Sequence, residues 1–213
     1  NISNMDTKLT GKTRIESDLI GAREIPAEAL YGVQTLRGIE NFSISKFRLS
    51  EYPLFIKGLA ITKMAAAMAN FELGLLTVEQ KDQFPVDMIQ GGAGTTTNMN
   101  ANEVIANRAL ELMGHERGEY QYCSPNDHVN CSQSTNDAYP TAIHIGMYFK
   151  HLQLLPHLEE LIASFRKKGE EFSRIIKMGR TQLEDAVPMT LGQTFNGFAS
   201  ILQDEIAHLN EAA

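Results

Sequence analysis

Three segments of the chain concentrate hydroxyl and amide side chains, which are neutral hydrogen-bonding groups. They are residues 91–98 (GGAGTTTN), residues 132–137 (SQSTND) and residues 179–182 (GRTQ). Each is expected to lie beside the N-terminus of a helix, where unpaired backbone N–H groups and the positive end of the helix dipole attract anions. The segments therefore indicate a site that can bind a carboxylate without a buried lysine.

Helix capping alone accounts for any one of these segments, because Ser, Thr, Asn and Asp are the favoured N-cap residues. A cap needs one such residue, however, whereas Thr95–Asn98 and Ser134–Asp137 each supply four in a row. When a proton is removed next to a carboxylate, an enediolate forms, and preorganised donors stabilise its two developing negative oxygens. The segments thus favour elimination or addition on a carboxylic acid. No base for the proton stands out, since a lone histidine such as His128 more often fills a hydrogen-bonding role.

Other kinds of site have less support in the sequence. The glycines around Ala93 match neither a Walker A loop nor a dinucleotide-binding fingerprint. Cys123 and Cys131 are the two cysteines, and His115 and His128 lie near them, but a CxxC or HxxxH spacing for zinc is missing. We therefore expect no metal and no cofactor.

The composition is that of a globular chain. Of its 213 residues, 43% are apolar and 21% charged, and 19 Lys and Arg against 26 Asp and Glu give a net charge of −7. This balance disfavours nucleic acid and anionic membrane surfaces as general partners. No apolar run approaches the roughly 18 residues of a membrane span, and the first residues do not resemble a signal peptide. We therefore expect a cytoplasmic protein.

Apolar residues at spacings of three and four predict four helices. They cover about residues 54–73, 98–113 and 142–168, and the chain from Pro188 onward. Gly114 is well placed to cap the second helix, and Pro156 should kink the third without ending it. The last helix has neither a C-cap glycine nor a following proline, so we expect this sequence to be part of a longer protein.

Residues 1 to about 50 are broken by glycines and show no sustained period, which indicates extended or irregular structure. The predicted fold is therefore mainly α, with a mixed, mainly helical N-terminal domain over residues 1–140. Residues 141–213 would form the first long helices of a central bundle. Their apolar stripes would be exposed on a monomer, so we expect self-association or mobile helices.

Resemblance to the fumarase/aspartase superfamily, and within it to the aspartate ammonia-lyases, is carried by several long stretches. They are IGAREIPAEALYGVQTLRGIENF (residues 20–42), GGAGTTTNMNANEVIANRALELMG (91–114), PNDHVN and SQSTNDAYPT (within 125–141) and GRTQLEDAVPMTLGQ (179–193). They stand in the order that the family has and cover nearly the whole chain. The resemblance implies a lyase that converts L-aspartate to fumarate, with a bundle of helices shared by a homotetramer and no cofactor.

The resemblance also implies roles for individual residues. It assigns the β-carboxylate of the substrate, which becomes the enediolate, to Thr95, Ser134 and Thr135. It assigns the ammonium and α-carboxylate end to Asn136, Thr181 and Gln182. The family's GSSxMPxKxNP loop, which carries the catalytic serine base, is not found in these residues and is expected beyond Ala213. The 213 residues alone are therefore expected to be inactive.

Four positions depart from the fumarase pattern. Gln182 stands where fumarases carry a histidine, which favours an aspartate ammonia-lyase over a fumarate hydratase. Ala93 replaces a serine, and Ser124 replaces the histidine of a secondary carboxylate site, which puts that site in doubt. Cys131 replaces a common lysine without a chemical meaning that we can assign. Fumarate hydratase remains an alternative, as does a non-catalytic structural relative comparable to the lens crystallins related to argininosuccinate lyase.

Overall fold

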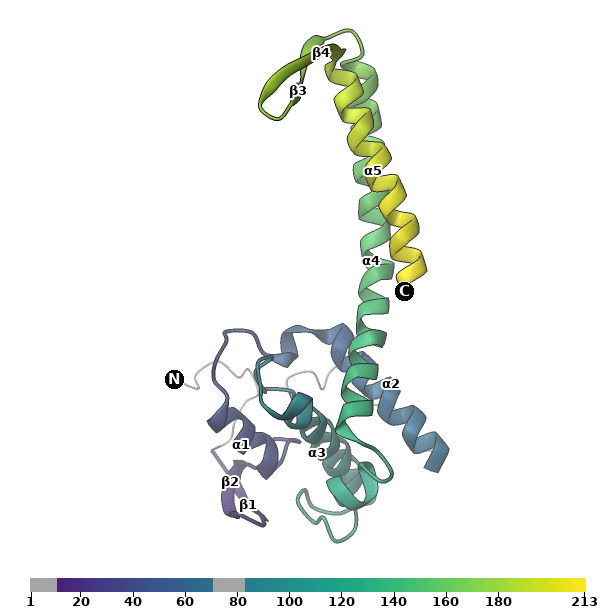
Figure 1. Cartoon of the computed structure of the whole chain (residues 1–213). Coiled ribbons are helices and arrows are strands. Elements are labelled where there is room, and N and C mark those ends of the chain that lie inside the picture. The colour runs from purple at the N-terminus through teal and green to yellow at the C-terminus, as the bar shows by residue number, and fades with distance from the viewer. Residues whose placement is uncertain (1–10, 71–82) are drawn as a thin grey trace. The chain divides into compact units, whose positions relative to one another are not determined.

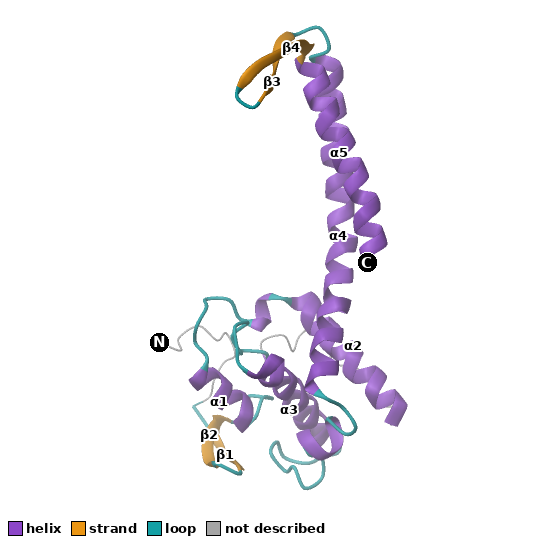
Figure 2. Cartoon of the chain, viewed as in Figure 1, coloured by secondary structure: helices purple, strands orange, loops and turns teal. Residues whose placement is uncertain are grey.

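Helices make up most of the structure, a computed structural model that describes residues 11–70 and 83–213 (Figures 1 and 2). The predicted mainly α fold is thus confirmed. Contacts within the chain divide it after Met147 into two compact units, the second of which is Tyr148–Ala213. We describe each unit by itself. In the described ranges no helix is long and apolar enough to cross a membrane.

The first unit combines one hairpin with several helices. Its elements are β1 (Thr13–Asp18), β2 (Gly21–Pro26), α1 (Val33–Asn41), η1 (Leu49–Glu51), α2 (Pro53–Asn70), η3 (Gly92–Gly94), α3 (Thr95–Leu112), η4 (Pro125–Val129) and the beginning of α4 (Thr135–Glu171). Strands β1 and β2 pair antiparallel. The buried apolar core is formed mainly by Ile25, Leu49, Leu59, Phe84, Val86, Val104 and Ala142. It draws α2, α3 and the start of α4 together.

Glycines allow the helices of this unit to approach closely. A Cβ atom on Gly58 of α2 would overlap the carbonyl oxygen of Ala142 in α4. A Cβ on Gly38 of α1 would likewise overlap the methyl group of Thr96 in α3. Substitution of either glycine would therefore force two helices apart.

Helix α1 corrects the prediction of extended or irregular structure over the first 50 residues. The backbone N–H groups of residues 32–35 are held by two buried carboxylates from other elements. Glu103 of α3 accepts from Gly32, Gln34 and Thr35 at 2.7–3.0 Å, and Glu16 of β1 accepts from Val33 at 3.0 Å. These groups have no partner within a helix, so the remote carboxylates stabilise its N-terminus. The local signals are weak, because the helix has only nine residues and its N-cap, Gly32, has no side chain to accept from the first turn.

The second unit contains the rest of α4, a hairpin and a final helix. Strands β3 (Ile176–Thr181) and β4 (Glu184–Thr190) pair antiparallel and are followed by α5 (Leu191–Ala212). Both predicted long helices are confirmed, and α4 continues through Pro156. Their facing sides bury Ile162, Ala199 and Ile206, with Leu155, Leu158, Phe165 and Leu202 packed around them.

Some predicted boundaries were wrong. Helix α3 begins at Thr95 instead of Asn98 and α4 at Thr135 instead of Ala142, because the polar segments themselves form the first turns. Helix α5 begins at Leu191, since Pro188 belongs to strand β4. The end of the predicted helix over residues 54–73 lies outside the described residues. The division into domains near residue 140 stays a prediction for the longer protein.

Candidate functional site

Helix α3 starts from a turn of three consecutive residues in the left-handed region. The φ angles of Gly92, Ala93 and Gly94 are 71°, 50° and 90°. Gly94 is the N-cap, and a Cβ there would overlap the ring of Tyr139 in α4, so this position needs glycine for two reasons. Thr95 follows at the first helical position, where it is exposed, and its hydroxyl donates to the carbonyl of Gly92 at 2.5 Å. The turn therefore presents Thr95 at a helix N-terminus.

Helix α4 starts from the second segment. The backbone N–H of Ala138 donates to the carbonyl of Ser134, and the N–H of Asn136 donates to the Ser134 hydroxyl oxygen at 3.2 Å. Ser134 and Asn136 are exposed, and Thr135 is half-buried. The first residues of this helix thus place three polar side chains at its N-terminus, as the sequence predicted.

The structure brings these two segments together. The amide Nδ2 of Asn98 in α3 donates to the hydroxyl oxygen of Thr135 in α4 at 3.2 Å. The same two helix starts line much of a pocket of about 330 Å³, through Gln90, Ala93, Gly94, Asn136 and Tyr139. Four of the six predicted site residues, Thr95, Ser134, Thr135 and Asn136, therefore lie on two neighbouring helix starts.

A buried lysine lies behind these helix starts, which the sequence analysis did not include in the site. The Nζ of Lys63 in α2, 4% exposed, donates to Asn130 Oδ1 at 3.1 Å and to Gln133 Oε1 at 2.9 Å. Asn130 Oδ1 also accepts from the side chains of Asn98 and Asn102 at 3.0 and 3.1 Å. Burial lowers the pKa of Lys63 to about 8. Lys63 follows the buried Leu59 by four residues and so lies on the apolar face of α2, which was the signal that could have found it.

The third segment has a different setting from the one predicted. Thr181 and Gln182 lie at the tip of the β3–β4 hairpin in the second unit, with the whole of β4 between them and α5. Gln182 and Leu183 have φ angles of 47° and 67°, which two-residue turns between antiparallel strands require. The prediction of a helix N-terminus here was wrong, because strand pairing and a 3.3 Å ion pair between Arg180 and Asp185 organise the segment.

Comparison with known proteins gives this arrangement a context. The family model described as lyase matches residues 21–213. The chain belongs to this lyase family, the fumarase/aspartase superfamily. It is 56% identical to the aspartate ammonia-lyase of Pseudomonas canavaninivorans over 216 residues and 50% identical to that of Escherichia coli K12 over 222 residues. These alignments cover 94% and 96% of this chain and 46% of each relative, so the chain spans about half the length of the curated relatives it matches.

Solved structures of the superfamily agree with this assignment. A fumarate lyase:delta crystallin from Brucella melitensis has a TM-score of 0.83 and 50% sequence identity, covering 94% of this chain and 50% of that one. A class II fumarase from Schistosoma mansoni has a TM-score of 0.77 and 36% identity, covering 92% of this chain and 44% of that one. The fumarase/aspartase fold is thus shared with relatives that carry different names.

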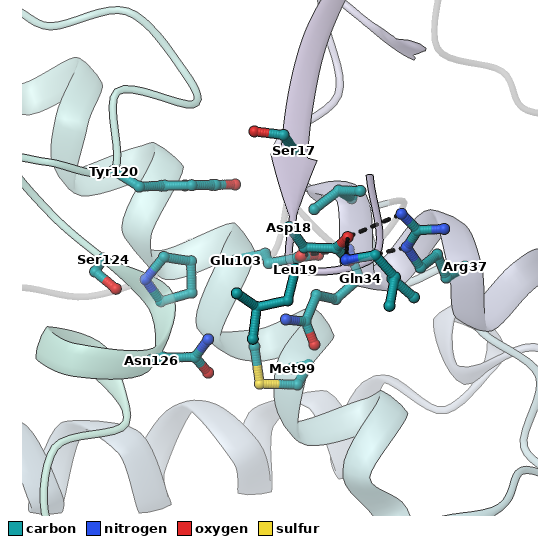
Figure 3. Close-up of a pocket in the computed structure, with 13 residues that line it drawn as sticks. Ser17, Asp18, Leu19, Gln34, Arg37, Met99, Glu103, Tyr120, Ser124 and Asn126 are labelled. Atoms are coloured by element: carbon teal, nitrogen blue, oxygen red, sulfur yellow. Dashed lines mark hydrogen bonds and ion pairs between the residues drawn. The ribbon is translucent and has the colours of Figure 1, made fainter. Parts of the chain in front are cut away.

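A second pocket, larger than the one lined by Asn136, lies elsewhere in the first unit (Figure 3). It measures about 580 Å³, and its charged lining is already paired. Asp18 and Arg37 form two contacts of 2.8 Å, and the guanidinium lowers the pKa of Asp18. The Tyr120 hydroxyl donates to Glu16 at 2.9 Å, while burial raises the pKa of both Tyr120 and Glu103. These groups hold β1, β2 and α1 in place.

Two further candidates from the sequence, His128 and Ser124, make hydrogen bonds within one turn. His128 Nδ1 accepts from the backbone N–H of Ser124 at 2.8 Å, and the Ser124 hydroxyl donates to Asp127 at 2.9 Å. Both residues therefore stabilise the turn η4. Cys123 and Cys131 are free thiols. Within residues 11–70 and 83–213 no three His, Cys, Asp or Glu side chains are arranged to hold a metal ion.

Proposed function

We propose that the full-length protein carrying this chain is an aspartate ammonia-lyase. The reaction is the reversible elimination of ammonia from L-aspartate to give fumarate. The observation that carries the proposal is the meeting of two helix N-termini, α3 with Thr95 and α4 with Ser134, Thr135 and Asn136, which the hydrogen bond from Asn98 to Thr135 joins. Gly94 and Asn136 of these two helix starts also line one pocket. The aspartate ammonia-lyases among the relatives, at 50–56% identity, support the choice of substrate.

Neutral donors at helix starts suit the intermediate of this reaction. A base removes the proton from the carbon next to the β-carboxylate, and the electron pair moves into that carboxylate to give an enediolate. The pair then returns to form the carbon–carbon double bond while the carbon–nitrogen bond breaks and ammonia leaves. Hydroxyl groups and backbone N–H groups that are already oriented stabilise the additional negative charge without reorganising. Thr95, Ser134 and Thr135 are the proposed donors.

The hydrogen bonds of these hydroxyls fit the role of donor. Thr135 Oγ1 accepts from Asn98, and Ser134 Oγ accepts from the N–H of Asn136, so each hydroxyl hydrogen can be donated to a carboxylate oxygen. The Thr95 hydroxyl has to turn from the Gly92 carbonyl toward the substrate. The proton acceptor is the serine of the GSSxMPxKxNP loop, which the family places outside these residues.

At the other end of the substrate, we assign the α-carboxylate and the ammonium group to Asn136, Thr181 and Gln182. The Gln182 amide can donate to a carboxylate but cannot act as an acid or base. This property favours ammonia elimination over the hydration catalysed by fumarases, which carry a histidine at this position. The net charge of −7 is compatible with a substrate that carries two carboxylates, because the binding groups are local.

We further propose that the full-length protein is a cytoplasmic homotetramer. The helices of the second unit expose several large apolar side chains, namely Tyr148, Leu152, Leu154, Leu161, Phe198 and Ile201, at 41–61%. A second copy of the chain would remove these side chains from water. The site would then be completed by residues from other subunits, as the superfamily resemblance implies.

The test is the substrate preference of the full-length protein. We expect fumarate to form from L-aspartate, and fumarate with ammonia to give L-aspartate in the reverse direction. Turnover of L-malate without turnover of L-aspartate would identify a fumarate hydratase, and a folded tetramer that converts neither would identify a structural relative. The isolated 213-residue chain should form no fumarate, and turnover by it would contradict the placement of the base outside these residues.

A further inference from the structure

Gln90 holds both ends of the turn that precedes helix α3. Its Oε1 accepts from the backbone N–H of Thr97 at 2.7 Å, and its Nε2 donates to the Thr97 hydroxyl oxygen at 2.6 Å. The same Nε2 donates to the backbone carbonyl of Asp87 at 3.0 Å. Thr97 lies in the first turn of α3 and is 1% exposed. One side chain therefore connects the helix start with the segment before the turn.

This contact supplies what the local sequence lacks. The N-cap of α3 is Gly94, which has no side chain to accept from the first-turn N–H groups, and Gln90 takes over that task for Thr97. The turn itself contains Ala93 at a φ of 50°, a conformation that is costly for a residue with a Cβ and persists only where its surroundings hold it. The Gln90 contacts enclose this strained turn.

The segment before the turn is firmly attached to the rest of the first unit. The Asp87 carboxylate accepts from the backbone N–H of Ser45 and of Ile89 at 2.7 and 2.8 Å, and from the Ser45 hydroxyl at 2.7 Å. Asp87 is 7% exposed, and these hydrogen bonds lower its pKa. Through its hydrogen bonds to Asp87 and Thr97, the Gln90 amide therefore fixes the start of α3 relative to this attached segment.

We infer that Gln90 is a positioning residue for the proposed carboxylate site. By holding Thr97 and Asp87 it fixes the turn that presents Thr95, and Gln90 itself lines the same pocket as Asn136. The inference rests on the proposed function. Its contribution to the reaction is placement, and a displacement of about 1 Å at a reacting group can lower a rate on the order of 100-fold.

The test compares two glutamines whose side-chain oxygens each accept from a backbone N–H at a helix start. Gln193 is the control: its Oε1 accepts from the Thr190 N–H at 2.8 Å, while its backbone N–H donates to the Thr190 hydroxyl oxygen at 3.1 Å. In the full-length protein we expect Gln90→Met to lower kcat/KM for L-aspartate by about tenfold or more. Gln193→Met should lower the melting temperature, because a helix cap is lost, and should leave kcat/KM within about twofold.

A third variant separates placement from folding. Gln90→Glu keeps an acceptor for the Thr97 N–H and adds a negative charge that a helix N-terminus favours, so the variant should fold. It loses both donated hydrogen bonds and places that charge on the wall of the pocket, so KM for L-aspartate should rise about tenfold or more, with a smaller change in kcat.

The outcomes distinguish this inference from the proposed function. If the unsubstituted protein converts L-aspartate, and the folded Gln90→Met and Gln90→Glu variants have kcat/KM values within twofold of its value, the positioning role is refuted. The proposed function is then left intact. An equal loss of activity in Gln193→Met would also refute the positioning role, because capping in general would then explain the effect. A protein that does not convert L-aspartate at all refutes the proposed function first.

Discussion

Replacement of Glu103 by glutamine tests how α1 is held. One carboxylate oxygen of Glu103 accepts from the N–H groups of Gly32 and Thr35 and from the Thr35 hydroxyl, and the other accepts from the N–H of Gln34. The amide oxygen in Glu103→Gln can keep the first set, but the NH₂ group then faces the Gln34 N–H. An unpaired donor costs about 1–3 kcal/mol, and the remaining bonds lose their charge assistance. We expect a net loss of about 2–4 kcal/mol, because relief of carboxylate burial offsets part of the cost.

Amide hydrogen exchange of the full-length protein measures this loss locally. At 1.4 kcal/mol per factor of ten, the N–H groups of residues 32–35 should exchange on the order of 30- to 700-fold faster in Glu103→Gln. Glu40→Gln is the control, because Glu40 lies in the same helix and forms an exposed 3.6 Å ion pair with Arg23, so its replacement should change exchange little. Equal protection in the two variants would show that Glu103 does not hold α1.

The pH dependence of stability gives an independent check on Glu103. Burial raises the pKa of Glu103 above its ordinary value of 4.5, so the folded state binds its proton more readily than the unfolded state does. Stability from this group is therefore complete below pH 4.5 and falls as the pH rises through the folded pKa. The amide in Glu103→Gln does not titrate, so the variant should lack this decline in stability. Identical profiles of stability against pH in the two proteins would contradict the assignment of the decline to Glu103.

Three further predictions concern other parts of the chain. Burial lowers the pKa of Lys63 from 10.5 to about 8, so between these pH values the unfolded state holds the proton and the folded state does not. The stability of the protein relative to Lys63→Met should therefore rise as the pH increases from about 8 to 10.5. Melting temperatures of both proteins at the two ends of this range test the prediction. Leu183→Gly removes a side chain from a residue at a φ of 67° and should stabilise the β3–β4 hairpin by about 0.5–1 kcal/mol; an unchanged or lower melting temperature would contradict this. Ile201→Glu places a charge at an exposed apolar position of α5 and should lower the association constant measured by sedimentation about tenfold or more. An unchanged association constant would show that Ile201 lies outside the interface.

Local periodicity predicted the helices well and failed where remote groups decide the structure. Apolar spacing located α2 to α5 because each helix buries one face along its own length. Helix α1 was missed because its apolar period spans only nine residues and its N-terminus is held by Glu103, which is 68–71 residues away in the chain, instead of by a local cap. The β3–β4 hairpin was missed because its turn uses Gln182 and Leu183 instead of the Asn-Gly or Asp-Gly that commonly marks such a turn.

The candidate site was predictable in kind and less so in detail. The types of side chain at Thr95 and at Ser134–Asn136 indicated helix starts, and the structure places both starts at one pocket. The supporting layer was not predictable, since Lys63 meets Asn130 across 67 residues of sequence and no local pattern links them. The position of Thr181 and Gln182 at a hairpin tip depended on strand pairing that polar composition does not reveal.

The contacts of Asn130 decide whether the loop before α4 can be exchanged between relatives. Its Oδ1 atom accepts from residues on two helices, Lys63 of α2 and Asn98 and Asn102 of α3, and its own NH₂ group donates to the Gln133 carbonyl. The loop before α4 is therefore specified by side chains that come from outside the loop. A graft of residues 129–137 onto a relative would carry the binding groups without their support. The loop can be exchanged only together with its three partners, Lys63, Asn98 and Asn102. We therefore expect the loop and these three residues to change together between relatives, or to stay unchanged together.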